Sequence, residues 1–458
     1  MIDVKKFVDT LDGKPVAVLG LGISNIAAVK ALLKAGASVV AWDDREENRA
    51  GVDAPMADLA QEYLGAYACL VLAPGIAHDH PAVRLAKDAG VEILCDIEIL
   101  HRCGHGCKTV GITGTNGKST TTALIGHILN ENGIKAAVGG NIGKPVLDLM
   151  LPPKDGVIVM EMSSFQLELC PAFAPDIAVH LNLSPDHLDR HGTMEGYAEA
   201  KMRIFRGPGK AVIGTDDEWS TKLFKIVAES GARECFPIAT SGILKDGVYV
   251  ENSMLCEAMY GDPVEIGEMN MASLPGVHNH QNAAAAYTAA RLLGLEPEAI
   301  MAAMQTFPGL EHRQYLVRTI NGVAYVNDSK ATNAAAAGRA LASYKNIYWI
   351  AGGRPKEGGL NGLEPYVGHI RHAFLIGEAM DDFGTWLDNH GVTHHFCTTL
   401  DIAVAEAHRL AQSERGQPGG TGMVLLSPAC ASFDQFKSFE QRGDRFTALV
   451  NVLKEDLA

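Results

Sequence analysis

The sequence predicts an α/β protein with three domains: a Rossmann-like N-terminal domain, a central domain of the P-loop ATPase type and a Rossmann-like C-terminal domain. Short apolar runs alternate with helical patterns along the chain, which is typical of mostly parallel sheets. Glycine-rich turns follow the first strand of two of these units. We expect the domains to span 1–97, 98–309 and 310–458, within the range for a chain of 458 residues.

The first segment has the pattern strand, glycine-rich turn, helix, strand, acidic residue. Apolar runs at 16–20 and 37–42 flank a helical pattern at 27–34, and a further strand at 69–73 ends in Pro74-Gly75. The turn, G-x-G-x-x-N, imitates a dinucleotide fingerprint, but its third glycine is replaced by Asn25, which disfavours NAD. The same geometry can bind the diphosphate of a UDP-sugar.

The second segment contains the strongest local motif, GITGTNGKST at 111–120, between a strand at 109–113 and a helix at 119–130. Gly114 and Gly117 allow backbone N–H groups to approach a polyphosphate, and Lys118 offers a positive charge to it. Ser119 and Thr120 sit where a hydroxyl binds Mg²⁺ or phosphate. A strict P-loop needs glycine at Ile112, so this is a variant loop. Further strands are expected at 157–160 and 177–181.

The third segment begins near Glu311, after the Pro308-Gly309 pair. Strands are predicted at 323–326, 347–351, 373–376 and 423–426. The stretch 412–420, QSERGQPGG, is predicted to be a solvated loop.

Composition argues against a nucleic-acid-binding, membrane or secreted protein. A formal net charge of −15 argues against a nucleic-acid-binding surface. No apolar run approaches the ~18 residues that cross a bilayer, and the N-terminus lacks the apolar core of a signal peptide. The nine scattered cysteines have no disulfide-framework spacing. We therefore expect a cytoplasmic protein with reduced thiols, no membrane partner and a monomeric state.

Several polar residues outside the loop are candidates for chemistry. Glu161 ends a strand beside the loop and is placed to hold Mg²⁺, and His187 is a possible ligand. Lys201, taken alone, is expected to be a solvated helix lysine. Asp186, Asp189 and His191 are interpreted as capping or surface residues.

Four strings together resemble the Mur ligase family: TGTNGKS at 113–119, NLSPDHLDRHG around His187, GVHNHQN at 276–282 and VNDSKATN around Asp328. The loop is also similar to that of folylpolyglutamate synthetases. The resemblance runs in order from Gly20 to Arg445. It implies an ATP-dependent ligase of the cell-wall pathway that activates a carboxylate as an acyl phosphate.

The resemblance also implies roles for particular residues. Those implied to bind ATP are Gly114, Thr115, Asn116, Gly117, Lys118, Ser119, Thr120, Asn279, Asn282, Arg313, Asp328 and Lys330. Those implied to bind a UDP-linked substrate are Ile23, Ser24, Asp43, Asp44, Arg45, Ala73, Pro74, Gly75, Asn141 and His187. Mg²⁺ would be held by Ser119, Glu161, His187 and a carbamylated Lys201. The catalytic set would be Lys118, Glu161, His187 and Lys201.

The string LSPACASFDQFKSFEQRGDRF at 426–446 is similar to that of family members that add D-glutamate to UDP-N-acetylmuramoyl-L-alanine. The resemblance implies that these two small molecules are the substrates, beside ATP and Mg²⁺. It implies a D-glutamate site made of Thr332, Lys356, Ser432, Phe433 and Phe439. Serine hydroxyl and lysine ammonium groups both supply donors that suit a carboxylate.

Other interpretations remain open at this point. A folylpolyglutamate synthetase would share the loop but has no need of a UDP-binding domain, and a dehydrogenase would leave the loop unexplained. A non-catalytic nucleotide-binding regulator need not keep Lys356 or the 426–446 string. Separately, His101, Cys103, His105 and Cys107 alternate in one segment. Their spacing suits an inter-domain linker better than a zinc site, which uses separated ligand pairs.

Overall fold

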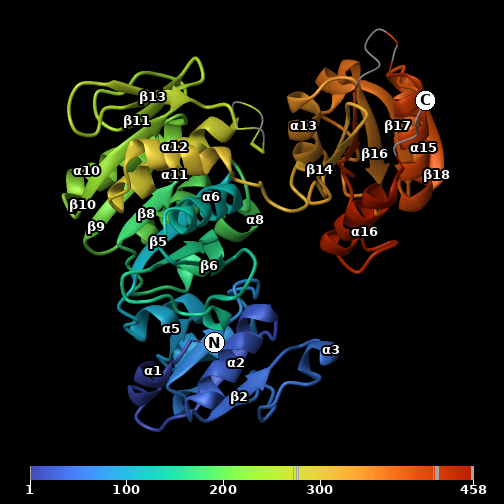
Figure 1. Cartoon of the computed structure of the whole chain (residues 1–458). Coiled ribbons are helices and arrows are strands. Elements are labelled where there is room, and N and C mark those ends of the chain that lie inside the picture. The colour runs from blue at the N-terminus through green and yellow to red at the C-terminus, as the bar shows by residue number, and fades with distance from the viewer. Residues whose placement is uncertain are drawn as a thin grey trace. The chain divides into compact units, whose positions relative to one another are not determined.

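The structure is a computed structural model, and it describes residues 2–271, 273–274, 276, 278–415, 417 and 422–454. The chain divides into two compact units (Figure 1). The first unit comprises Met1–Met271 and Val277–Phe307, and the second comprises Ala272–Gly276 and Pro308–Ala458.

The first unit begins with a four-stranded parallel sheet in the order β2-β1-β3-β4, as expected for a doubly wound domain. Its two central strands are buried throughout because helices cover the sheet. Its elements are α1 (Lys5–Asp9), β1 (Val16–Leu19), α2 (Ile23–Lys34), β2 (Val39–Trp42), α3 (Glu46–Arg49), β3 (Cys69–Leu72), α4 (Pro81–Asp88), β4 (Glu92–Leu94) and α5 (Asp96–Arg102).

Helix α2 begins four residues earlier than its apolar pattern predicts. Gly22 is its N-cap, so Ile23 and Ser24 lie in the first turn rather than in a loop. The prediction missed this turn because Ser24 and Asn25 interrupt the apolar periodicity. The free N–H groups at the start of α2 therefore follow β1 immediately, which is the geometry of an anion-binding turn.

The first unit also contains a nine-stranded sheet in the order β13-β12-β11-β10-β9-β8-β5-β7-β6. It is parallel from β6 to β11, and β12 and β13 join it antiparallel. Its strands are β5 (Lys108–Thr113), β6 (Ala136–Gly140), β7 (Val157–Glu161), β8 (Ile177–His180), β9 (Gly209–Gly214), β10 (Arg233–Ala239), β11 (Val248–Glu251), β12 (Met254–Glu257) and β13 (Val264–Glu268). The expected strands at 109–113, 157–160 and 177–181 are confirmed, whereas β6 and β9 to β13 were not predicted.

The helices associated with this sheet are α6 (Lys118–Glu131), α7 (Ser164–Glu168), α8 (Leu188–His191), α9 (Met194–Met202), α10 (Glu218–Ser230), α11 (His278–Leu292) and α12 (Pro297–Gln305). Helix α6 follows directly from the phosphate loop. Helices α7, α8 and α9 follow the strands that end nearest to that loop, β7 and β8. Because parallel strands end at the same edge of a sheet, these helices begin near the phosphate loop.

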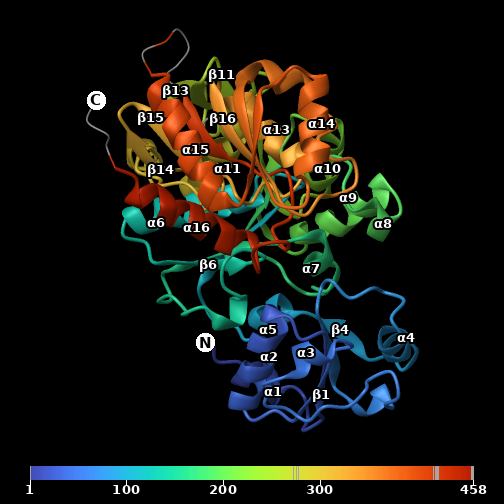
Figure 2. The same cartoon turned by 90° about the vertical axis from the view of Figure 1, so that its right-hand side faces the viewer.

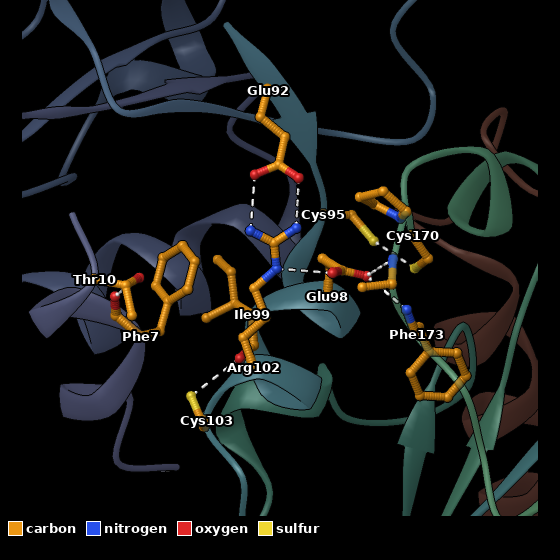
Figure 3. Close-up of polar contacts among 12 residues, drawn as sticks. Phe7, Thr10, Glu92, Cys95, Glu98, Ile99, Arg102, Cys103, Cys170 and Phe173 are labelled. Carbon is orange, nitrogen blue, oxygen red and sulfur yellow. Dashed lines mark hydrogen bonds and ion pairs between the residues drawn. The ribbon is translucent and has the colours of Figure 1, made fainter. Parts of the chain in front are cut away.

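Helix α5 joins the two sheets of the first unit and lies between them in both views (Figures 1 and 2). Its residue Glu98 is fully buried, and its carboxylate accepts the backbone N–H groups of Ala172 and Phe173 at 3.1 and 3.0 Å. The other carboxylate oxygen accepts Arg102 Nε at 2.8 Å, and Arg102 also forms a fork with Glu92 (Figure 3). One continuous apolar core extends through both sheets.

The second unit has a six-stranded sheet in the order β14-β15-β19-β16-β17-β18, parallel except for β14. The four predicted strands of this segment are confirmed. The elements are β14 (Tyr315–Ile320), β15 (Val323–Asn327), α13 (Ala334–Ser343), β16 (Ile347–Gly352), β17 (Ile370–Ile376), α14 (Met380–Asn389), β18 (His394–Thr398), α15 (Leu400–Ser413), β19 (Met423–Leu426) and α16 (Phe439–Val452).

The predicted loop at 412–420 is wrong at its start, because helix α15 continues to Ser413. Gln412 there donates a hydrogen bond to the carbonyl of Ile320, which anchors the last helical turn to the sheet. Positions 416 and 418–420 of the same stretch lie outside the described residues.

Candidate active site

The phosphate loop connects β5 to α6 and is shaped by glycine. Gly117 has φ +84, a conformation that a residue with a side chain adopts at a cost. A Cβ atom at Gly117 would lie 2.0 Å from Oδ1 of Asn282. The ammonium group of Lys118 folds back over the loop and donates to the carbonyls of Gly114 and Thr115 at 2.9 and 2.8 Å. The loop is therefore already closed around the place where a phosphate would lie.

Asn182 holds the outer part of this loop, and the sequence analysis missed it. Its carbonyl accepts the N–H of Thr115 at 2.9 Å, and its side chain exchanges two hydrogen bonds with the backbone of Asn116 at 2.9 and 3.2 Å. Gln281 in helix α11 accepts the remaining amide hydrogen of Asn182 at 2.7 Å. The asparagine that follows the predicted strand at 177–181 was a detectable signal, because polar residues at strand ends of parallel sheets face the ligand.

Asn279 and Asn282 lie in the first turns of α11, both buried. Asn279 Oδ1 accepts Asn282 Nδ2 at 3.0 Å, and Thr121 Oγ1 lies 3.4 Å from Asn282 Oδ1. The structure thus places both residues against the phosphate loop. Of the string at 276–282, Val277 and the side chain of His278 lie outside the described residues.

Lys201 is buried in α9 with 1% exposure, so the expectation of a solvated lysine is wrong. Its ammonium group donates to the Gly114 carbonyl at 2.8 Å and to Thr113 Oγ1 at 3.3 Å, and it lies 4.7 Å from the centre of the Tyr197 ring. Burial lowers the pKa of Lys201 well below its usual value, and the nearby Lys118 adds to this. The neutral amine, which a lowered pKa favours, is the nucleophilic form of a lysine.

Glu161 lies at the end of β7 and is 3% exposed. One carboxylate oxygen accepts Asn141 Nδ2 at 3.0 Å, and the other, Oε2, is buried with no hydrogen-bond partner. A buried carboxylate oxygen without a partner is costly, which fits a position that a cation fills. The donor chemistry of Glu161, with the Ser119 hydroxyl and the His187 imidazole, therefore fits a divalent cation.

His187 precedes α8 and has φ +52, which is uncommon for a residue with a side chain. Its side chain is half exposed and packs 5.0 Å from the ring of Phe165. His191 was expected at the surface, but its side chain is 1% exposed. It contacts Ser164 Oγ at 2.9 Å and Glu168 at 3.3 Å, because the short α8 turns it toward α7.

Three of the residues described above, Lys118, His187 and Lys201, line a cavity of about 500 Å³ within the first unit. Eight of the predicted site residues line it: Ile23, Ser24, Pro74, Gly75, Lys118, Asn141, His187 and Lys201. Other lining residues were not predicted, namely Gly140, Gly143, Pro145, Ser163, Ser164, Phe165, Gln166 and Tyr197. The cavity therefore has one wall from the glycine-rich turns of the N-terminal sheet and another from the phosphate-loop sheet.

The N-terminal wall is rigid behind the cavity. Asn25, which replaces the third glycine of the fingerprint, donates to the carbonyls of Leu19 and Gly20 at 3.0 and 2.9 Å. Asp43 accepts the N–H groups of Leu21 and Arg45 at 2.6 and 2.9 Å. Burial alone would raise the pKa of Asp43, but these backbone donors outweigh it and leave the pKa lowered. Asp43 supports the turn in this way, whereas Asp44 and Arg45 are exposed.

In the second unit, Asp328 lies at the end of β15 and is fully enclosed. It accepts Ser427 Oγ at 2.7 Å and the N–H of Gln314 at 3.1 Å, while burial raises its pKa to about 7. Lys330 lies 5.5 Å from the Phe439 ring. Lys356 is exposed and follows the Gly352-Gly353 turn. Arg354, after this turn, forms a backbone bridge with Ala431, which lies in the 426–446 string.

Arg442 is the residue of this unit that the sequence analysis missed. Its guanidinium is buried and donates to Ser329 Oγ, to the Ser329 carbonyl and to the Cys430 carbonyl at 3.0, 2.9 and 3.0 Å. It therefore joins the strings that carry Lys330 and Ser432. Ser432 is 2% exposed, whereas Phe433 is 63% exposed. No feature of the sequence distinguishes Arg442 from the solvated arginines around it.

The chain matches known protein families over both of its N-terminal sheets. Residues 14–95 match the model of the "Mur ligase MurD-like, N-terminal domain", and residues 112–290 match that of the "Mur ligase middle domain". A protein of Paramagnetospirillum magneticum named UDP-N-acetylmuramoylalanine--D-glutamate ligase is 46% identical, over 98% of both chains.

The chain belongs to the Mur ligase family.

Relatives of the same name agree with this membership. They include proteins of Rhodospirillum rubrum, 46% identical over 96% of this chain and 94% of the relative, and of Agrobacterium fabrum, 44% identical over 98% and 97%. Among solved structures, UDP-N-acetylmuramate-alanine ligase MurC of Thermotoga maritima is 18% identical with a TM-score of 0.60, over 96% of this chain and 100% of that one. At that identity the likeness concerns the fold, that of a Mur ligase with N-terminal, middle and C-terminal domains.

The segment from His101 to Cys107 has no evident place in the chemistry of this Mur ligase. Cys103 Sγ donates to the Ile99 carbonyl at 3.0 Å, Cys107 Sγ to the carbonyls of Pro152 and Pro153 at 3.4 Å, and His105 accepts the Cys107 N–H. Within the described ranges, no group of three or more His, Cys, Asp or Glu side chains could hold a metal ion.

Among the residues that the structure describes, no helix is long and apolar enough to cross a membrane.

Proposed function

We propose that this Mur ligase joins D-glutamate to UDP-N-acetylmuramoyl-L-alanine in peptidoglycan precursor synthesis, with ATP converted to ADP and phosphate. The observation that carries the proposal is the single cavity lined by Ser24 and Gly75 on one wall and by Lys118 and Lys201 on the other. A helix N-terminus and a phosphate loop are both sites for phosphate groups, so the cavity suits a UDP-linked substrate beside ATP. The 426–446 string supports D-glutamate as the second substrate.

The proposed reaction has two steps. The carboxylate of the L-alanyl group attacks the γ-phosphorus of ATP, ADP leaves, and an acyl phosphate forms. The amine of D-glutamate, after losing a proton, then attacks the acyl carbon, and phosphate leaves with the bonding electrons. Activation is needed because a free carboxylate is a poor electrophile. Placing two anionic substrates beside ATP is a large part of the catalysis, because it replaces chance encounters with a fixed geometry.

We propose that Lys118 and the backbone of 114–120 bind the β- and γ-phosphates, with Asn279 and Asn282 beside them. In the second unit, Arg313, Asp328 and Lys330 would contact the nucleotide. Ser119, Glu161, His187 and a carbamylated Lys201 would hold Mg²⁺, whose charge offsets that of the phosphate oxygens. The unpartnered Oε2 of Glu161 supports this assignment.

Carbamylation of Lys201 is supported by its environment. The lowered pKa favours the neutral amine, and a neutral amine can add to CO₂ to give a carbamate. The product is an anion, which suits a cation better than the ammonium that it replaces. We expect intact-mass analysis under native conditions to show a gain equal to the mass of CO₂, and we expect Lys201→Met to remove that gain.

We also propose residues for the two substrate sites. The UDP-linked substrate would contact Ile23, Ser24, Asn141, His187 and the Ala73–Gly75 turn, with the 43–45 segment nearby. The D-glutamate site would comprise Thr332, Lys356, Ser432, Phe433 and Phe439. We also propose domain limits of 1–97, 98–309 and 310–458, a cytoplasmic location and a monomeric state.

The test is phosphate release from ATP in the presence of UDP-N-acetylmuramoyl-L-alanine and one candidate amino acid at a time. We expect release only with D-glutamate, accompanied by the matching gain of mass on the nucleotide-linked product. Release with a different amino acid would keep the ligase and overturn the D-glutamate site. Nucleotide binding with no release under any condition would favour a regulator.

A further inference from the structure

Arg190 is a largely but not fully buried cation that the reaction proposed above does not use. It lies in the short helix α8, three residues after His187, and its side chain is 11% exposed. Its guanidinium lies 4.7 Å from the centre of the Phe165 ring and 3.2 Å from the carboxylate of Glu168, which is 14% exposed. An arginine so far removed from water requires partners in fixed positions, unlike an ordinary surface ion pair.

The remaining contacts of Arg190 cross to the other wall of the cavity. Nη1 donates to the carbonyl of Ile76 at 2.8 Å, and Nη2 donates to Nε2 of His78 at 2.8 Å. Burial, and then Arg190 itself, lower the pKa of His78, which keeps the ring neutral and able to accept this hydrogen bond. Ile76 directly follows Pro74 and Gly75, which line the cavity.

Arg190 therefore joins three cavity-forming segments. The Pro74–Gly75 turn comes from the N-terminal sheet, Phe165 and Glu168 belong to α7, and the backbone of α8 continues from His187. The guanidinium can do this because its several donors lie in one rigid plane and reach separate acceptors at once.

We propose that Arg190 is a positioning residue of the ligase reaction, which fixes the Pro74–Gly75 turn against α7 and His187 so that the cavity is preformed for the UDP-linked substrate. This inference rests on the proposed function for its substrate. Without Arg190, the turn would keep only the contact of His78 with Glu168 at 3.3 Å, and it would have to be ordered when the substrate binds. That ordering cost weakens binding, by about tenfold in affinity for roughly 1.4 kcal/mol.

The experiment compares the wild type with Arg190→Ala and with Arg102→Ala as a matched control. Arg102 also pairs with two carboxylates of the first unit, the fully buried Glu98 and the exposed Glu92 (Figure 3). Neither carboxylate lines the cavity. We expect Arg190→Ala to raise the KM for UDP-N-acetylmuramoyl-L-alanine about tenfold, while the KM for ATP and kcat change less than about threefold. We expect Arg102→Ala to lower stability and leave all three constants near wild type.

A second readout is amide hydrogen exchange of residues 74–80 in the ligand-free enzyme. Exchange in this segment should be faster in Arg190→Ala and unchanged in Arg102→Ala. Unchanged exchange in Arg190→Ala overturns the inference, as does an unchanged KM or an equal rise in KM in Arg102→Ala. Hydrogen exchange needs no substrate, so it tests whether Arg190 orders the turn even if the wild type has no ligase activity. Such inactivity would contradict only the proposed function. Should Arg190→Ala fail to fold, Arg190→Gln, which keeps an apolar stem and one amide, carries the same readouts.

Discussion

Asp96 and Lys201 are ionisable side chains that the fold removes from water. Asp96 begins helix α5 and is fully buried, and burial raises its pKa to about 6 although it accepts the N–H of Ile97 at 3.0 Å. Lys201 is buried beside the phosphate loop, and its pKa is lowered well below normal. Desolvation disfavours the charged form in both cases, so an acid and a base shift in opposite directions.

Asp96→Asn should change how stability depends on pH. Because the pKa of Asp96 rises from 3.8 to about 6 on folding, its stabilising contribution is present below pH 3.8 and is lost as the pH rises through about 6. Asparagine keeps the oxygen that accepts the Ile97 N–H and cannot ionise. We expect the variant to gain on the order of 2–3 kcal/mol in unfolding free energy relative to wild type between pH 4 and pH 8. Urea unfolding at both pH values would measure this, and a pH-independent difference would contradict it.

Lys118→Ala should abolish ligation and leave the fold intact. The ammonium group is the positive charge nearest the expected phosphates, and its loss removes a stabilising contact that strengthens as negative charge moves to the leaving ADP. We expect phosphate release to fall by at least about a thousandfold, with little change in the thermal unfolding midpoint. Near-normal turnover in a folded Lys118→Ala protein would refute the assignment of the loop.

At the scale of elements, the phosphate loop depends on a helix that is distant in sequence. Gly117 ends the loop at φ +84, and the side chain of Asn282 from α11 occupies the space where a Cβ would lie. Asn182, after β8, binds the backbone of the outer loop. The conformation of a ten-residue motif is thus fixed by two asparagines from other elements.

Gly117→Ala should weaken ATP binding more than it weakens the fold. Gly133 is a matched control, since it has φ +77 but nothing within 4 Å of its would-be Cβ. Both alanine variants bear the cost of a left-handed residue, about 1–2 kcal/mol. Only Gly117→Ala must also displace Asn282, so we expect its ATP dissociation constant to rise at least about tenfold, measured by calorimetry. Equal ATP affinity in the two variants would show that the contact with Asn282 is unimportant.

At the scale of the whole molecule, the first unit depends on how its two sheets are joined. Glu98 is fully buried in α5 and binds both Arg102 and the backbone of Ala172 and Phe173, and one core continues across the joint (Figure 3). The cavity has walls from both sheets, so its shape depends on the apolar core that they share.

Glu98→Ala should destabilise the first unit substantially, because it leaves Nε of Arg102 and the N–H groups of Ala172 and Phe173 without their acceptor. We expect a loss of about 3–5 kcal/mol in unfolding free energy. Glu92→Ala removes the more exposed partner of the same arginine and should cost about 1 kcal/mol or less. Urea unfolding would compare the two, with amide exchange to check that residues 308–415 are unaffected. Similar losses in both variants would contradict the central role of Glu98.

The sequence by itself predicted the class of fold, most strands around the site and the family, because short motifs with fixed backbone geometry, such as GTNGKST, carry that information locally. It missed several strands, β9 to β13 among them, and it missed the first turn of α2, where Ser24 and Asn25 break the apolar period. Only the tertiary structure decided that Lys201 and His191 are buried, that Glu161 has an unpartnered oxygen, and that Asn182, Arg190 and Arg442 connect separate strings. Burial and long-range hydrogen bonding depend on which elements meet in space, and spacing along the chain does not specify that.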